Sequence, residues 1–138
     1  MHRSFLSPDE VQNTFYEAVA RGDLDTLVNL WSDEEDVVCT HPAGMQLSGL
    51  AAIRRGWQGV FAHGGIVLSA RSVIRWNSMT LSGNHITEAL IKDGKPAAQF
   101  YSTHIFSRGP FGWRLVCRQT LPVSEELLAM TTPGRVLH

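Results

Sequence analysis

One carboxylate lies inside an apolar stretch of the sequence, at Glu88 in the segment Ile86-Thr87-Glu88-Ala89-Leu90. Because side chains alternate between the two faces of a strand, Ile86, Glu88 and Leu90 are expected to share one face. An isolated ionised carboxylate is unfavourable to bury, so Glu88 should either find partners, such as an arginine, or have a raised pKa suited to acid–base chemistry. Glu88 is therefore a candidate catalytic residue, with a structural ion pair as the alternative.

A histidine, His41, follows the short β-forming run Val37-Val38-Cys39-Thr40 and comes directly before Pro42. Proline keeps the preceding residue extended, which places the imidazole near the rim of a sheet. Neutral imidazole can act as a general base near pH 7, as a hydrogen-bond partner or as a metal ligand. His41 is the second candidate catalytic residue, and a polar residue tolerated at a strand end is the alternative.

Other chemistries have weaker support in the sequence. The histidines at 41, 63, 85 and 104, together with Cys117, show none of the spacings typical of metal sites. The chain contains no G-x-S-x-G motif and no phosphate-binding loop. We expect no metal and no cofactor, and a metal-dependent dehydratase is the weakest of the hypotheses considered.

The composition excludes several classes of partner. The 138 residues include 12 Lys and Arg against 13 Asp and Glu, for a formal net charge of −1. Without a basic stripe we expect no nucleic-acid partner, and the balanced charge gives no attraction to anionic membranes. Two distant cysteines, and the lack of an export signal or a long apolar segment, predict a cytoplasmic protein with no membrane contact.

The spacing of apolar residues predicts three helices in the first half of the chain. Ser7 and Glu10 form a capping box, and Gly22 ends this first helix. Asp23 is expected to cap a second, short helix and Ser48 a third. The three apolar stripes are Val11, Phe15, Ala18 and Val19, then Leu24, Leu27, Val28 and Trp31, and then Leu50, Ile53, Trp57, Val60 and Phe61.

The second half of the chain changes to a period of two and predicts four strands, over residues 66–76, 86–91, 97–106 and 113–119. In the strand over 97–106, both faces are mixed and largely apolar, so His104 is expected to be a core or interface residue. Helices followed by an antiparallel meander predict an α+β fold with the N-terminal helices packed on one face of a curved sheet. We expect a single domain over 1–138, with its core at about 8–123 and a tail at 124–138.

Four segments carry a resemblance to a known family. They are FYEAVARGDLDTLVNLW (15–31), VVCTHPAG (37–44), SGLAAIRRGW (48–57) and GWRLV (112–116). In this order they resemble the SnoaL-like branch of the nuclear transport factor 2-like superfamily, over roughly residues 8–123. The resemblance implies a cone-shaped curved antiparallel sheet with helices on its concave face, a pocket between them, and a homodimer formed through the outer face of the sheet.

The same superfamily contains ketosteroid isomerase, and the resemblance allows a comparison of positions. His41 matches the general-base position, whereas Phe15 and Thr103 stand at or near the positions of the two oxyanion-hole donors. We therefore do not expect ketosteroid isomerisation, because stabilisation of the enolate by those donors is a large part of that catalysis.

The resemblance also implies a set of ligand-binding residues around His41 and Glu88. It turns Ile86 and Glu88 toward the pocket, with residues of the next two strands beside them. The expected ligand-binding residues are Phe15, Trp31, Trp57, Phe61, Ile86, Gln99, Tyr101, Thr103, Cys117 and Gln119.

Two main hypotheses follow for the function. The first is a dimeric protein that binds a small apolar or aromatic molecule and catalyses proton transfer of the isomerase, cyclase or dehydratase type. In this hypothesis His41 is the base and Glu88 is its acid or orienting partner. The alternative is a non-catalytic module for ligand binding or dimerisation.

Overall fold

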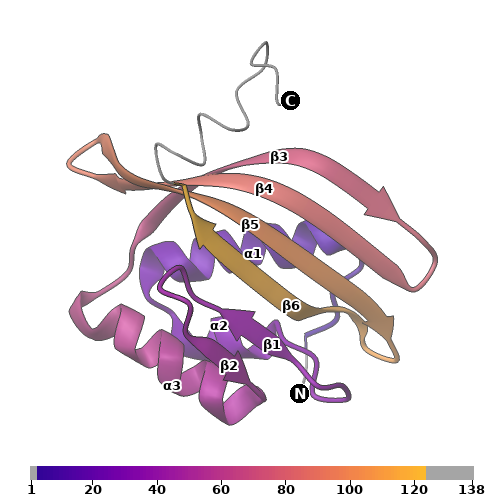
Figure 1. Ribbon diagram of the computed structural model, residues 1–138. Helices are drawn as coiled ribbons and strands as arrows, with labels where there is room; N and C mark the ends of the chain where they lie inside the picture. Colours follow the sequence, from indigo (N-terminus) through magenta and orange to yellow (C-terminus); the bar gives the residue numbers. More distant parts are fainter. Residues whose placement is uncertain (1–2, 124–138) are drawn as a thin grey trace.

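The computed structural model describes residues 3–123, which form three α-helices and one six-stranded sheet (Figure 1). The predicted tail at 124–138 lies outside the described residues. The elements in chain order are α1 (Pro8–Arg21), α2 (Leu24–Asn29), β1 (Val38–Thr40), β2 (Gln46–Ser48), α3 (Leu50–Val60), the 3₁₀ helix η1 (Phe61–His63), β3 (Val67–Asn77), β4 (Leu81–Lys92), β5 (Lys95–Gly109) and β6 (Gly112–Pro122).

The helix ends follow from local capping. The Ser7 side chain accepts a hydrogen bond from the Glu10 amide at 3.1 Å, and Gly22 ends α1 in the left-handed conformation at φ 68°. Asp23 caps α2 in the same way as Ser7 caps α1. The prediction for α3 is wrong in one respect: Ser48 is the last residue of β2, and Gly49 occupies the cap position without a side-chain bond.

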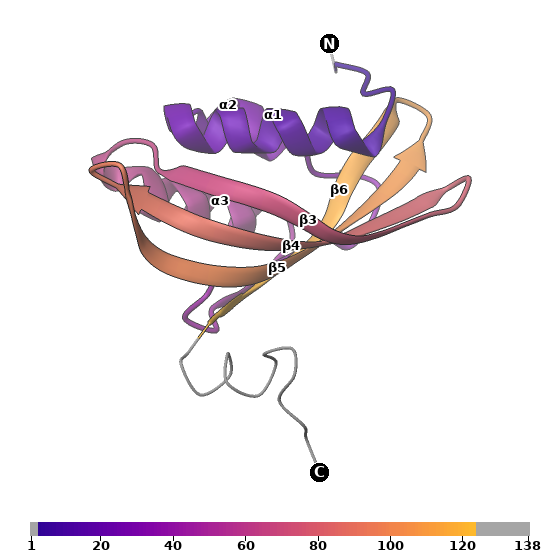
Figure 2. The ribbon, with the colours of Figure 1, turned by 90° about the horizontal axis from the view of Figure 1, so that it is seen from above.

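The sheet has the strand order β2-β1-β6-β5-β4-β3. Neighbouring strands are antiparallel except β1 and β6, which run parallel. The sheet is curved and not closed, and the helices lie on its concave side (Figure 2). The predicted α+β fold with N-terminal helices on one face of a curved sheet is confirmed, and β2 is a strand that the sequence pattern did not predict.

The register fixes which side chains face the helices. Glu88 on β4 pairs with Phe100 on β5, and Ser102 on β5 pairs with Thr120 on β6. His104 pairs with Arg118, so these side chains share the inner face with Glu88. Ile105 and Phe106 on β5 pair with Cys117 and Leu115 on β6, so Val116 is the extra residue of a bulge on β6. This bulge shifts the alternation of side chains on that part of β6.

The core lies between the inner face of the sheet and the helices. All four residues of the predicted α1 stripe are buried, as are Ile53 and Trp57 on α3. Phe15 packs edge-on against Trp57, with the ring centroids 5.7 Å apart. None of the helices within residues 3–123 is long and apolar enough to cross a membrane.

Candidate functional site

A cavity of about 500 Å³ lies between the C-terminal end of α3, the turn joining β1 to β2, and the inner face of the sheet. We call it the apolar pocket. Its polar side chains are His41, Arg118 and Thr120, and no acidic residue among 3–123 lines it. The apolar side chains of its wall include Met45, Trp57, Val60, Ile66, Leu68, Leu90 and Phe100. A concave apolar wall with a few polar groups is the usual form of a small-molecule site.

Arg118, which lines the apolar pocket, forms a buried ion pair with Glu88. Nη1 of Arg118 donates to Oε2 of Glu88 at 2.9 Å, and Nη2 donates to Oε1 at 2.8 Å. The side chains are 5% and 0% exposed, respectively. This two-pronged geometry aligns the guanidinium and the carboxylate in one plane and fixes the position of Arg118.

Two hydroxyl groups complete the coordination of Glu88. Tyr16 donates to Oε2 at 2.5 Å and Ser102 donates to Oε1 at 2.6 Å. Burial alone would raise the pKa of Glu88, but the charge of Arg118 and the bonds from Arg118, Ser102 and Tyr16 outweigh it and lower the pKa to about 2. Glu88 is therefore ionised at neutral pH, which favours the expected role as an orienting partner over the role as an acid. Its remaining role is to orient Arg118.

His104 braces Arg118 from the opposite side. Nη1 of Arg118 lies 2.8 Å from Nε2 of His104, and Nδ1 of His104 lies 3.1 Å from Oε1 of Gln12. Burial, and then the charge of Arg118, lower the pKa of His104 to about 3. A neutral ring that accepts from Arg118 and donates to Gln12 satisfies both contacts. His104 is thus a core residue, one of the two places expected for it.

His41 lies across the apolar pocket in the turn that follows β1. Its backbone amide bonds to the Met45 carbonyl at 2.9 Å, which closes the turn. The ring packs edge-on against Trp57 at a centroid distance of 5.1 Å, and Nε2 is buried without a hydrogen-bond partner among residues 3–123. Burial, followed by the charge of Arg118, lowers the pKa of His41. The imidazole is consequently neutral at pH 7 and able to accept a proton.

The side chains of five of the expected ligand-binding residues lie on the outer face of the sheet, whereas the side chain of Glu88 lies on the inner face. Because Phe100, Ser102 and His104 take the inner positions of β5, the intervening residues point outward. Cys117 and Gln119 face outward on β6 because the inner positions belong to Arg118 and Thr120. The expectation that the following residues share the face of Glu88 is therefore wrong: Gln99, Tyr101, Thr103, Cys117 and Gln119.

The other expected ligand-binding residues divide between the pocket and the core. Of these residues, Trp57 lines the apolar pocket together with His41. Phe61 packs against Trp57 at 5.6 Å, whereas Phe15 and Ile86 are buried in the core. Phe15 lies beneath the guanidinium of Arg118, whose Cζ is 4.8 Å from the ring centroid. These contacts make Phe15 a support for Arg118.

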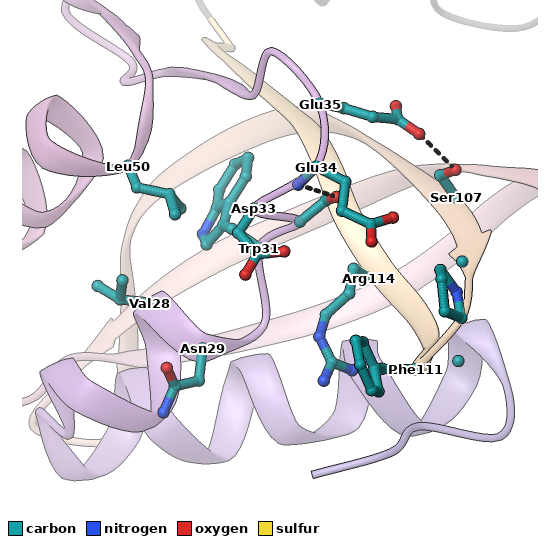
Figure 3. A pocket seen from close by; sticks show the side chains of 14 residues that line it. Val28, Asn29, Trp31, Asp33, Glu34, Glu35, Leu50, Ser107, Phe111 and Arg114 are labelled. Atoms are coloured by element: carbon teal, nitrogen blue, oxygen red, sulfur yellow. Dashed lines mark hydrogen bonds between the residues drawn. The ribbon is translucent and has the colours of Figure 1, made fainter. Parts of the chain in front are cut away.

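Trp31 belongs to a different and smaller cavity, at the end of β6 near the turn from β5 (Figure 3). This cavity measures about 100 Å³, and its lining includes Trp31, Leu50 and Arg114. The acidic segment 33–35 borders it, and Oε1 of Glu35 accepts a hydrogen bond from Ser107 at 3.0 Å. Trp31 therefore does not line the apolar pocket with His41 and Trp57, although it belongs to the same hydrophobic core as Trp57.

Sequence reasoning missed the residues that bind Glu88. Tyr16, Ser102 and Arg118 come from α1, β5 and β6, so no local motif joins them. A signal was nonetheless present, because a carboxylate in an apolar strand requires a partner. Arg118 is a charged residue in a similarly apolar stretch, flanked by Leu115, Val116 and Leu121, and so could be that partner.

The described part of the chain contains no assembled site for metal binding or for a reactive thiol. Within residues 3–123, no three His, Cys, Asp or Glu side chains gather in a group that could hold a metal ion. Both cysteines are free, and burial raises the pKa of the Cys39 thiol to about 11. A buried thiol with a raised pKa is a poor nucleophile.

Comparison with known families gives a match over most of the chain. The profile of the SnoaL-like domain matches residues 9–120. No curated protein matches the chain.

Two solved structures share 28% sequence identity with the chain. One is a candidate calcium/calmodulin-dependent protein kinase type II association domain from Thiobacillus denitrificans, with a TM-score of 0.80, covering 88% of this chain and 98% of that one. The other is a candidate dehydratase of the nuclear transport factor 2-like family from Streptomyces avermitilis, with a TM-score of 0.73, covering 83% of this chain and 91% of that one. A candidate ketosteroid isomerase from Parabacteroides distasonis, at 18% identity, 86% and 89% coverage and a TM-score of 0.69, shares the fold.

Proposed function

The chain belongs to the SnoaL-like domain family, and we propose that it binds a small, largely apolar molecule in the apolar pocket and transfers a proton with His41 as the base. The observation that carries this proposal is the position of the His41 ring, whose pKa is lowered by burial, in a pocket whose other polar side chains within residues 3–123 are Arg118 and Thr120. Neutral imidazole has a basicity suited to proton abstraction near pH 7.

Arg118 supplies the second half of the proposed chemistry. When a proton leaves carbon next to a carbonyl group, negative charge develops on the oxygen, and a fixed guanidinium in an apolar site stabilises that charge. Glu88 acts through Arg118 and is a positioning residue, because all its described bonds go to Arg118, Tyr16 and Ser102. Isomerisation, cyclisation and dehydration can all begin with this step, and the similarity to a candidate dehydratase supports the class.

Ligand binding and turnover can be tested in sequence. Aromatic ketones and hydroxyketones are screened for an increase in melting temperature, and every compound that binds is then incubated with the wild type and with His41→Gln. We expect a compound that is converted by the wild type and, at least about a hundredfold more slowly, by the variant. His63→Gln, an exposed histidine outside the pocket, is the matched control and should retain full turnover. Binding without turnover that depends on His41 would contradict the catalytic part of the proposal.

The second candidate is a non-catalytic module that pairs with a second copy of the chain. The outer face of the sheet favours it, because Ile74, Trp76 and Leu121 lie there and are 57%, 43% and 59% exposed. Large exposed apolar side chains on an open sheet face, here on β3 and on β6, are a feature of interfaces. The similarity to a candidate association domain agrees with this idea.

Sedimentation velocity tests the proposed pairing directly. We expect a dimer for the wild type and a monomer for Trp76→Lys, because a charge at this position would have to be buried. Met79→Lys changes an 82% exposed residue in the turn between β3 and β4 and should remain dimeric. A wild type that stays monomeric at all concentrations would contradict the pairing.

A further inference from the structure

Arg118 has more hydrogen-bond donors than its described partners use. A guanidinium carries five N–H groups. Glu88 accepts a hydrogen bond from one N–H of Nη1 and from one N–H of Nη2. Nε2 of His104 accepts a hydrogen bond from the second N–H of Nη1. Within residues 3–123, Nε–H and the second Nη2–H have no acceptor. In a planar guanidinium these two N–H bonds lie on the same edge and point the same way.

Three described residues surround the Arg118 guanidinium on sides other than this free edge. Glu88 covers the tip of the guanidinium, His104 covers the Nη1 flank, and Phe15 covers one face of the group. Arg118 nevertheless lines the apolar pocket, as does Thr120, two residues along the strand. The flank opposite His104 carries Nε–H and the second Nη2–H, and no hydrogen bond within residues 3–123 covers it.

Among residues 3–123, no group accepts a hydrogen bond from this edge. Glu88 already accepts four hydrogen bonds, from Tyr16, Ser102 and the two Nη atoms of Arg118, and it has no capacity to turn. No acidic side chain among residues 3–123 lines the pocket. A hydrogen-bond acceptor on a ligand in the pocket would satisfy this edge.

We propose, building on the proposed function, that the ligand of the apolar pocket is a monocarboxylate with an apolar body, bound through both carboxylate oxygens to Nε and Nη2 of Arg118. Two parallel donors match the two oxygens of a carboxylate, and such two-pronged bonds are among the strongest that proteins form. The apolar wall accommodates the rest of the molecule. A dicarboxylate or a phosphate is disfavoured because Arg118 is the only cationic side chain that lines the pocket within residues 3–123.

The binding of a matched pair of probes tests this inference. 2-Naphthylacetate and 2-naphthylacetamide have nearly the same shape, but only the first offers two equivalent anionic oxygens. Isothermal titration at pH 7 should give an affinity of the wild type for the acid at least about tenfold higher than for the amide. This comparison uses the unmodified chain and does not depend on a variant that folds.

Three variants locate the effect. Arg118→Lys keeps the charge but lacks the two-donor edge, so the preference for the acid should fall to about twofold or less. Arg114→Lys, on the same strand but lining the smaller cavity, should keep the full preference. Leu90→Trp adds a large side chain to the wall of the apolar pocket and leaves both residues of the ion pair in the sequence, and it should abolish binding of both probes.

The outcomes separate this inference from the proposed function. Equal affinity for acid and amide, with both lost in Leu90→Trp, would overturn the carboxylate inference and leave an apolar binding pocket in place. A preference for the acid that persists in Arg118→Lys would also overturn it. If neither these probes nor the ketones bind, the proposed function fails as well.

Discussion

The substitution Glu88→Gln provides a stringent test of the buried ion pair, because it removes the charge and nearly keeps the shape. Glu88 has a pKa of about 2 in the folded chain, against 4.5 for an ordinary glutamate. At about 1.4 kcal/mol per pKa unit, ionisation of Glu88 stabilises the fold by about 3 kcal/mol. Breaking a buried pair by removing one charge typically costs about 3 to 5 kcal/mol, which agrees with this value.

The sign of the pH dependence follows from the lowered pKa. A carboxyl group with a lower pKa in the folded state stabilises the protein fully above its unfolded pKa. This contribution is lost as the pH falls from about 4.5 toward 2. The stability difference between the wild type and Glu88→Gln should therefore be greatest at neutral pH and shrink steadily below pH 4.5.

Urea unfolding followed by far-ultraviolet circular dichroism measures this difference at pH 7, 5, 4 and 3. Glu17→Gln, an exposed glutamate on α1, is the matched control and should change the free energy of unfolding by less than about 0.5 kcal/mol. The reasoning is refuted if Glu88→Gln destabilises by less than about 1 kcal/mol at pH 7, or if its effect is constant down to pH 3.

Two further substitutions have defined outcomes. Tyr16→Phe removes the 2.5 Å hydrogen bond to Glu88, so it should lower the free energy of urea unfolding by about 1.5 to 3 kcal/mol. The pH below which the protein loses stability should also move to a higher value. An unchanged dependence of stability on acidic pH would contradict this role of Tyr16. In Gly65→Ala the new β-carbon would lie 2.1 Å from the backbone oxygen of Ala20, so we expect at least about 2 kcal/mol of destabilisation. Gly59→Ala meets nothing within 4 Å and should be neutral or slightly stabilising, and equal melting temperatures for the two alanine variants would contradict the packing argument.

The fold could be predicted from the sequence wherever one local pattern determines one element. The first helix has a cap at Ser7, a stop at Gly22 and a single apolar stripe, and the structure reproduces all three. The third helix lacks a capping side chain, and the sequence pattern therefore assigned that role to Ser48, which instead pairs with Val38 in the sheet.

The candidate site was predictable only in part because it is built from several strands. On β4 the inner face was correctly predicted, since Ile86 and Glu88 share it. On β5 both faces are largely apolar. The alternation of side chains therefore cannot tell whether the face with Tyr101 or the face with Ser102 points inward. The resemblance to relatives assigned the face with Tyr101 to the inner side of the sheet, which is wrong. The partnership of Arg118 with Glu88 spans two strand pairings, and only the register could reveal it.

The central claim is that the free edge of Arg118 binds a carboxylate inside the apolar pocket. A crystal structure of the chain with 2-naphthylacetate tests it most directly. We predict carboxylate oxygens about 2.7 to 2.9 Å from Nε and Nη2 of Arg118, with the naphthyl ring against Trp57 and within reach of His41. The claim is contradicted if the ligand occupies the smaller cavity beside Trp31 or the outer face of the sheet while the edge of Arg118 binds only water.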